Sequence, residues 1–115
     1  NIRWKFLQGK KTDFYDVYGD GVIKIIFTPG HTPGHSSVLV NLPKTGHMLL
    51  TGDACYTGDH WCDKCLPGLV ASASDAADSV KKLRKVAKDH NAKVVWGHDP
   101  VSWLDWKKAP MFYYD

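Results

Sequence analysis

The feature that most constrains the fold is an almost unbroken apolar, β-branched run at residues 22–27, Val-Ile-Lys-Ile-Ile-Phe. Such a run predicts a strand that is buried on both faces of its sheet. Residues 36–42 and 47–51 flank a Pro-Lys-Thr-Gly turn, so they predict a hairpin. Further strands are expected at residues 2–6, 14–17 and 93–96. The strands therefore imply a sheet that needs cover on both sides.

One helix is predicted, at residues 74–90, because apolar side chains recur there at helical spacing. Ser74 is a suitable N-cap, since aspartates follow it near the positive end of the helix dipole. Asn91 is expected to end the helix. Residues 59–68 are predicted to be a loop, and residues 101–115 form a tail rich in aromatic side chains.

A single helix cannot cover both faces of a sheet made from such apolar strands. The uncovered face would present a large apolar patch to water. We therefore expect a partner for this chain. It is a missing N-terminal half, another chain or a second copy of this one.

The net charge of +3 is modest, and most of the clustered cations fall within the predicted helix. They are Lys81, Lys82, Arg84, Lys85 and Lys88. A solvated helix face explains them better than nucleic-acid binding, because no basic loop with interleaved aromatics accompanies them. No apolar run is long enough to span a membrane. A nucleic-acid or membrane partner is therefore not expected.

The chain contains three cysteines, an odd number that argues against a disulfide framework and favours a reducing, cytoplasmic location. Cys62 and Cys65 form a Cys-x-x-Cys pair, with Cys55 and His60 nearby. A zinc site would usually need a second such pair, so free or redox-active thiols are the preferred interpretation. The chain starts at Asn1, not at Met, and an upstream segment is expected.

Three glycine-containing turns each follow an apolar strand and carry a side chain that can bind metal. They are Thr-Pro-Gly-His-Thr-Pro-Gly-His at 28–35, Thr-Gly-Asp at 51–53 and Gly-His-Asp at 97–99. Neutral imidazoles of His35 and His98 are good zinc ligands, and the two oxygens of Asp53 can bridge two cations. A lone histidine after a strand is usually an ordinary loop residue. Three such turns in this order favour a metal site for hydrolysis.

These three motifs, with the doubled Thr-Pro-Gly-His run as the most specific, resemble the second half of the metallo-β-lactamase fold. The resemblance covers roughly residues 14–115 and implies an α/β fold, the C-terminal half of an αββα sandwich with a mixed sheet and a flanking helix. It implies that His35 binds one of two zinc or other divalent ions, Asp53 bridges them, and His98 binds the second. His31 would then be a structural loop residue.

The residues after Asp53 resemble the lactonases that open N-acyl-homoserine lactones, which carry a tyrosine at the position of Tyr56. Thiolesterases of the glyoxalase II type typically have a threonine where this chain has Ala54. The resemblance implies that metal ions activate water for attack on the lactone carbonyl, with Tyr56 donating a hydrogen bond to that carbonyl or the leaving alkoxide. Trp61 would line the acyl-chain pocket or cap the core. Asp99 would orient a histidine or begin the next turn.

The family's other signature, His-x-His-x-Asp-His, does not occur in this sequence. Residues 1–115 are therefore expected to be a partial domain that binds metal weakly and is inactive alone, because catalytic zinc usually has three protein ligands. The intact protein is expected to be a quorum-quenching lactonase. The alternatives are another hydrolase of the superfamily, such as a thiolesterase, or a non-catalytic binding or assembly module that retains the scaffold.

Overall fold

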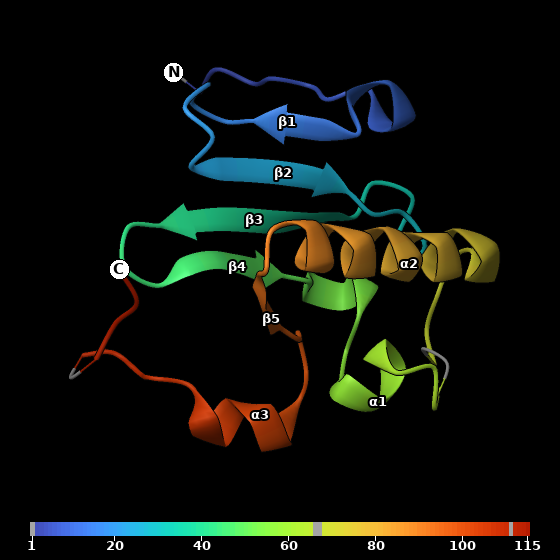
Figure 1. Cartoon of the computed structure of the whole chain (residues 1–115). Coiled ribbons are helices and arrows are strands. Elements are labelled where there is room, and N and C mark those ends of the chain that lie inside the picture. The colour runs from blue at the N-terminus through green and yellow to red at the C-terminus, as the bar shows by residue number, and fades with distance from the viewer. Residues whose placement is uncertain (1, 66–67, 111) are drawn as a thin grey trace.

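The described chain is organised around a mixed sheet of five strands in the computed structural model, which covers residues 2–65, 68–110 and 112–115. The strands are β1 (Phe14–Asp16), β2 (Ile23–Phe27), β3 (Ser36–Leu42), β4 (Gly46–Leu50) and β5 (Lys93–Val95). They lie in the order β1-β2-β3-β4-β5 (Figure 1). The helices are α1 (Gly58–Trp61), α2 (Ala73–Asp89) and α3 (Pro100–Asp105), with single 3-10 turns η1 (Gly9–Thr12) and η2 (Gly52–Ala54).

The pairing of the strands confirms the predicted hairpin and brings distant segments together. Across β3 and β4, Asn41 pairs with His47, and all neighbours up to β4 are antiparallel. β5 joins the free edge of β4 in parallel, with Leu50 opposite Val95. A parallel pair needs a crossover connection, and α2 lies within it. The ends of β4 and β5 therefore lie side by side.

One face of the sheet packs against α2, which runs along it in Figure 1. Ile26, Leu39 and Leu49 come from three neighbouring strands and contact a cluster that includes Leu83 and Val86 of the helix. Each of these side chains is at most 6% exposed. Burial of a side chain of this size contributes about 1.5–3 kcal/mol. This layer is the hydrophobic core of the described chain.

The other face of the sheet is only partly covered. In β2, Ile26 is buried, but Ile23, Ile25 and Phe27 are only half-buried. Leu50 of β4 is 40% exposed. The prediction that the 22–27 run is buried on both faces is therefore wrong for this chain, because the helix covers one side alone.

The helix α2 begins earlier than predicted. Ser72, and not Ser74, is the N-cap, since its backbone is extended and its hydroxyl accepts a hydrogen bond from the Asp75 N–H. Asn91 ends the helix as predicted, with a left-handed φ of 48°. No helix in the described ranges has the length and hydropathy to cross a bilayer.

Three other segments differ from the sequence predictions. Residues 2–6 are not a strand, because no neighbouring strand pairs with them and Trp4 and Phe6 stay exposed. The predicted loop at 59–68 overlaps α1, which Thr57 caps by accepting from the His60 N–H. The aromatic tail begins with α3, where Asp99 is the N-cap and proline takes the first position. Residues 66, 67 and 111 lie outside the described chain.

The close packing of Gly30 on α2 gives a test of the fold. The φ of Gly30 is 140°, and a Cβ there would lie 2.4 Å from backbone atoms of Ala76. Gly30→Ala should lower the free energy of unfolding by about 1–3 kcal/mol, as overpacking does, in urea denaturation. Gly34→Ala is the matched control, since a Cβ there meets nothing within 4 Å. Equal stability of the two variants would contradict this packing.

Candidate metal centre

The three turns predicted to carry metal ligands meet at one edge of the sheet. Phe27 at the end of β2 pairs with Ser36, so residues 28–35 form a loop at the edge where β4 and β5 also end. The last two turns nearly touch. A Cβ on Gly97 would lie 2.5 Å from the Gly52 carbonyl oxygen. The glycines in these turns therefore permit an approach that a side chain would block.

Asp53 lies at the centre of the cluster. Its Oδ1 is 2.7 Å from Nε2 of His98, and its backbone N–H donates to Nε2 of His35 at 3.1 Å. The structure thus brings together all three residues that the sequence predicts as metal ligands. The side chain of Asp53 is 39% exposed and that of His98 is 64% exposed, so the cluster is open to solvent.

His31 also lies in this cluster. Its Nε2 is 3.5 Å from Oδ2 of Asp53, on the opposite carboxylate oxygen from His98. Its Nδ1 is 3.0 Å from both the carbonyl oxygen of Leu69 and the hydroxyl of Tyr56. The sequence assigns His31 only a structural role in its loop. The doubled Thr-Pro-Gly-His run is the signal that could have placed both histidines at the site.

Tyr56 stands beside the same histidines. Its ring lies 5.0 Å from that of His98 and 6.0 Å from that of His31, both in edge-on arrangements. The carbonyl of Tyr56 accepts a hydrogen bond of 2.9 Å from the His98 N–H. The Tyr56 loop and the His98 turn are therefore fixed to each other through the backbone.

Asp99 also connects the Tyr56 loop to the His98 turn, through its side chain. Its Oδ2 accepts from the Gly58 N–H at 2.9 Å, and its Oδ1 accepts from the Val101 and Ser102 N–H groups at the start of α3. These hydrogen bonds, with Gly58 first, lower the pKa of the carboxyl. Among the described residues, the Asp99 carboxylate makes no hydrogen bond to a histidine ring, and it caps the start of the next helix.

Burial sets the charge state of the histidine nearest the sheet. It lowers the pKa of His35, although the Thr28 carbonyl and the Asp53 carboxylate act in the opposite direction. A neutral imidazole is the form that binds metal. The buried Cys55 thiol has its pKa raised to about 12, again mainly by burial, so it is unreactive at neutral pH.

The donor set fits a zinc-type metal in kind but is incomplete in number. Imidazole nitrogen and carboxylate oxygen are both zinc ligands. Gly52 keeps the space beside His35 open, since a Cβ there would lie 3.0 Å from Nε2. Within the described ranges, no group of three or more His, Cys, Asp or Glu side chains is arranged to hold a metal ion. His35, Asp53 and His98 would therefore be part of a ligand set.

Two other predicted features lie outside this cluster. Trp61 packs against the hydrophobic core and lies 6.5 Å from Trp96, ring to ring, which favours the core-capping interpretation. Cys62 and Cys65 are exposed free thiols, as preferred from their spacing. The zinc interpretation of this pair gains no support.

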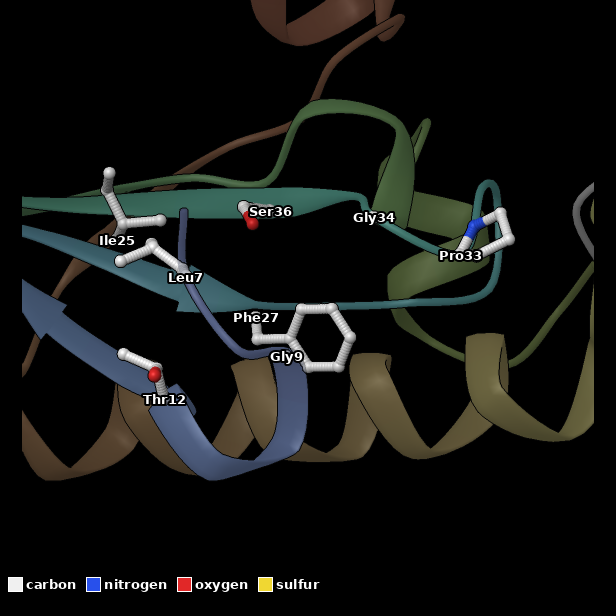
Figure 2. A pocket seen from close by; sticks show the side chains of 8 residues that line it. All are labelled: Leu7, Gly9, Thr12, Ile25, Phe27, Pro33, Gly34 and Ser36. Atoms are coloured by element: carbon white, nitrogen blue, oxygen red, sulfur yellow. The ribbon is translucent and has the colours of Figure 1, made fainter. Parts of the chain in front are cut away.

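A cavity of about 250 Å³ lies between the N-terminal segment and the partly covered sheet face. Figure 2 shows Leu7 next to Ile25 and Phe27 beside Gly9 at its wall. The lining contains no titratable side chain. This cavity is separate from the cluster around Asp53.

A family profile described as the metallo-beta-lactamase superfamily matches residues 4–98. The chain belongs to the metallo-beta-lactamase superfamily. Its mixed sheet with a flanking helix agrees with the predicted fold class. A solved N-acyl homoserine lactone hydrolase, with the product N-hexanoyl-L-homoserine bound at its catalytic metal centre, superposes with a TM-score of 0.79 at 29% identity. The match covers 89% of this chain and 39% of that one, in its C-terminal part.

Curated proteins with similar sequences include lactonases. The N-acyl homoserine lactonase AttM of Rhizobium radiobacter is 57% identical over 112 residues, or 97% of this chain and 43% of the relative. An N-acyl homoserine lactonase of Bacillus cereus is 35% identical over 99 residues, or 86% of this chain and 37% of the relative. The chain thus spans less than half the length of these relatives.

His60, which the sequence left unassigned to the site, gives a pH-dependence test. Its side chain is 6% exposed, its Nδ1 accepts from the Tyr56 N–H, and burial lowers its pKa. Below the ordinary pKa of 6.5, the histidine takes up a proton more readily in the unfolded chain than in the folded chain. The unfolding free energy should therefore fall as the pH decreases below 6.5.

His60→Asn keeps an acceptor near Tyr56 but removes the titrating ring. Urea denaturation at a series of pH values should give a shallower acid slope for this variant than for the unaltered protein. Identical slopes would contradict the role of His60. The lowered pKa values of His35 and His47 should leave part of the slope in place.

Proposed function

We propose that the protein to which this chain belongs is a metal-dependent hydrolase that opens the lactone ring of N-acyl homoserine lactones and so quenches quorum signals. The observation that carries the proposal is the Asp53 carboxylate, with His98 on one oxygen and His31 facing the other, beside the Tyr56 hydroxyl. The identity of 57% with the AttM lactonase supports the choice of substrate class.

In this proposal His35, Asp53 and His98 would hold zinc. When bound, zinc polarises a carbonyl and makes water a stronger nucleophile. Both carboxylate oxygens of Asp53 face the cluster, one toward His98 and the other toward His31, so both would be able to take part in metal binding. The lowered pKa of His35 supports its assignment as a neutral ligand.

Tyr56 is proposed to bind the substrate through its hydroxyl proton. The Leu69 carbonyl can only accept, so Nδ1 of His31 carries a proton and donates toward Leu69 and the Tyr56 oxygen. The Tyr56 hydroxyl then has its own proton free to donate. A donor at this place stabilises the negative charge that develops on the lactone carbonyl or the leaving alkoxide.

The remaining metal ligands are proposed to come from an N-terminal half with the His-x-His-x-Asp-His signature, on the same polypeptide or another chain. The incomplete ligand set and the half-buried sheet face around Ile25 support this proposal. Residues 1–115 would then be a partial domain without activity alone. The free thiols are consistent with a proposed cytoplasmic location.

The decisive substitution is Asp53→Asn in the protein of natural length. It should reduce lactone opening to background and lower the zinc content, measured by product chromatography and elemental analysis. Asp59→Asn is the matched control, since Asp59 pairs with Lys64 at the surface. Zinc and activity should persist in that control. Cleavage of thioesters without lactone opening would point instead to a thiolesterase, and unaltered function of Asp53→Asn to a non-catalytic module.

Tyr56→Phe tests the proposed hydrogen bond. Removing one donor to a developing oxyanion should lower kcat about a hundredfold. Zinc content should stay the same, because the hydroxyl is not a proposed ligand. Tyr15→Phe is the control, as Tyr15 contacts Lys5 far from the cluster. An unchanged kcat in Tyr56→Phe would exclude this role.

A further inference from the structure

A chain of buried hydroxyl groups lies directly behind His35. Thr28, Ser37 and Thr51 are each at most 1% exposed. Oγ1 of Thr28 is 2.8 Å from Nδ1 of His35 and 3.0 Å from Oγ of Ser37. Ser37 in turn donates to the Thr51 carbonyl at 2.9 Å. These contacts join the first two turns of the candidate metal centre through the interior.

The direction of each hydrogen bond in this chain follows from its two ends. At one end, the Asp53 N–H donates to Nε2 of His35, so Nε2 carries a lone pair and Nδ1 carries the proton. At the other end, the Thr51 carbonyl can only accept, so the Ser37 hydroxyl donates to it. The oxygen of Ser37 is then left to accept from Thr28, and the oxygen of Thr28 to accept from His35.

We propose that Thr28 and Ser37 are positioning residues that hold His35 in the tautomer with its proton on Nδ1, so that Nε2 stays unprotonated and can bind a metal ion in place of the Asp53 N–H that it accepts here. The binding of a metal ion by Nε2 of His35 rests on the proposed function, but the tautomer itself does not. The chain runs from His35 through Thr28 and Ser37 to the carbonyl of Thr51, which lies two residues before Asp53. It therefore links the ring orientation of one ligand to the backbone that carries the next.

Ser37 accepts the proton of the Thr28 hydroxyl and so keeps that hydroxyl from donating to His35. Without the Ser37 oxygen, the Thr28 hydroxyl loses this acceptor and can turn to donate to Nδ1 of His35, 2.8 Å away. That bond favours the opposite tautomer, in which Nε2 is protonated and cannot bind metal. The Thr28 carbonyl, 3.1 Å from Nδ1, and the Asp53 N–H, 3.1 Å from Nε2, still favour the original tautomer. Loss of Ser37 should therefore give a mixture of the two His35 tautomers.

The test reads the His35 tautomer by ¹⁵N NMR of the imidazole nitrogens in the metal-free protein of natural length. The unaltered protein should have the proton on Nδ1, while Ser37→Ala and Thr28→Val should both gain the Nε2–H form. Thr28→Ser keeps the hydroxyl, so its spectrum should match that of the unaltered protein. Ser36→Ala is the matched control, because Ser36 is exposed and lies outside the chain of hydroxyls.

Zinc affinity, measured by competition with a chelator, gives the second readout. Ser37→Ala and Thr28→Val should bind zinc about 10–100-fold more weakly, as loss of a partner behind a ligand usually does. Unchanged tautomer spectra in both variants would overturn the proposal. If one variant fails to fold, the other decides. Absence of lactone opening in the unaltered protein would overturn the proposed function alone, since the NMR readout needs neither metal nor lactone.

Discussion

The parallel pairing of β4 with β5 is the contact on which the candidate metal centre depends. With Leu50 opposite Val95, the turns after the two strands leave the sheet side by side. Asp53 and His98, 45 residues apart, then come within 2.7 Å. The crossover is held in place by Leu83 and Val86 of α2, so the packing of one helix fixes the separation of the two side chains. The site geometry is thus a consequence of core packing between the sheet and α2.

Polar groups at this edge satisfy one another inside the protein. The Thr51 hydroxyl lies 2.9 Å from the Cys55 carbonyl and 3.1 Å from that of Val95, so it ties the Asp53 turn to the end of β5. A buried hydroxyl without a partner would cost about 1–3 kcal/mol. Among the described residues, the buried side-chain atoms left without a partner are Nε of Arg84 and Nε1 of Trp96. Trp96 immediately precedes the Gly97-His98 turn.

One face of the sheet is only partly covered. Leu50 is 40% exposed, and Ile25 and Val38 on the same face are only half-buried, although all three lie in strands. Apolar surface of this kind is normally covered by other parts of a protein. The metal ligands show the same incompleteness, since the described residues gather no set of three. Both the hydrophobic face and the ligand set are consistent with the chain's span of 43% of the AttM relative.

Local sequence patterns specify the strands of the sheet, the long helix and the three ligand-bearing turns. Periodicity and turn residues are local signals, so 36–42 was found to the residue and 74–90 to within one residue at each end. The family resemblance predicts that His35, Asp53, His98 and Tyr56 share one site, and the structure brings them together. Local signals failed for residues 2–6, whose apolar pattern lacks a pairing strand.

The surroundings of those ligands depend on tertiary contacts. His31 lies near Asp53 because the loop 28–35 folds back over the ends of β4 and β5. Thr28 and Ser37 stand at the ends of predicted strands in the sequence, yet the structure buries their hydroxyls behind His35. Burial and hydrogen-bond direction depend on neighbours that are distant in the chain. Burial and hydrogen-bond direction are therefore specified by the packing of the strands and not by a local pattern of residue types.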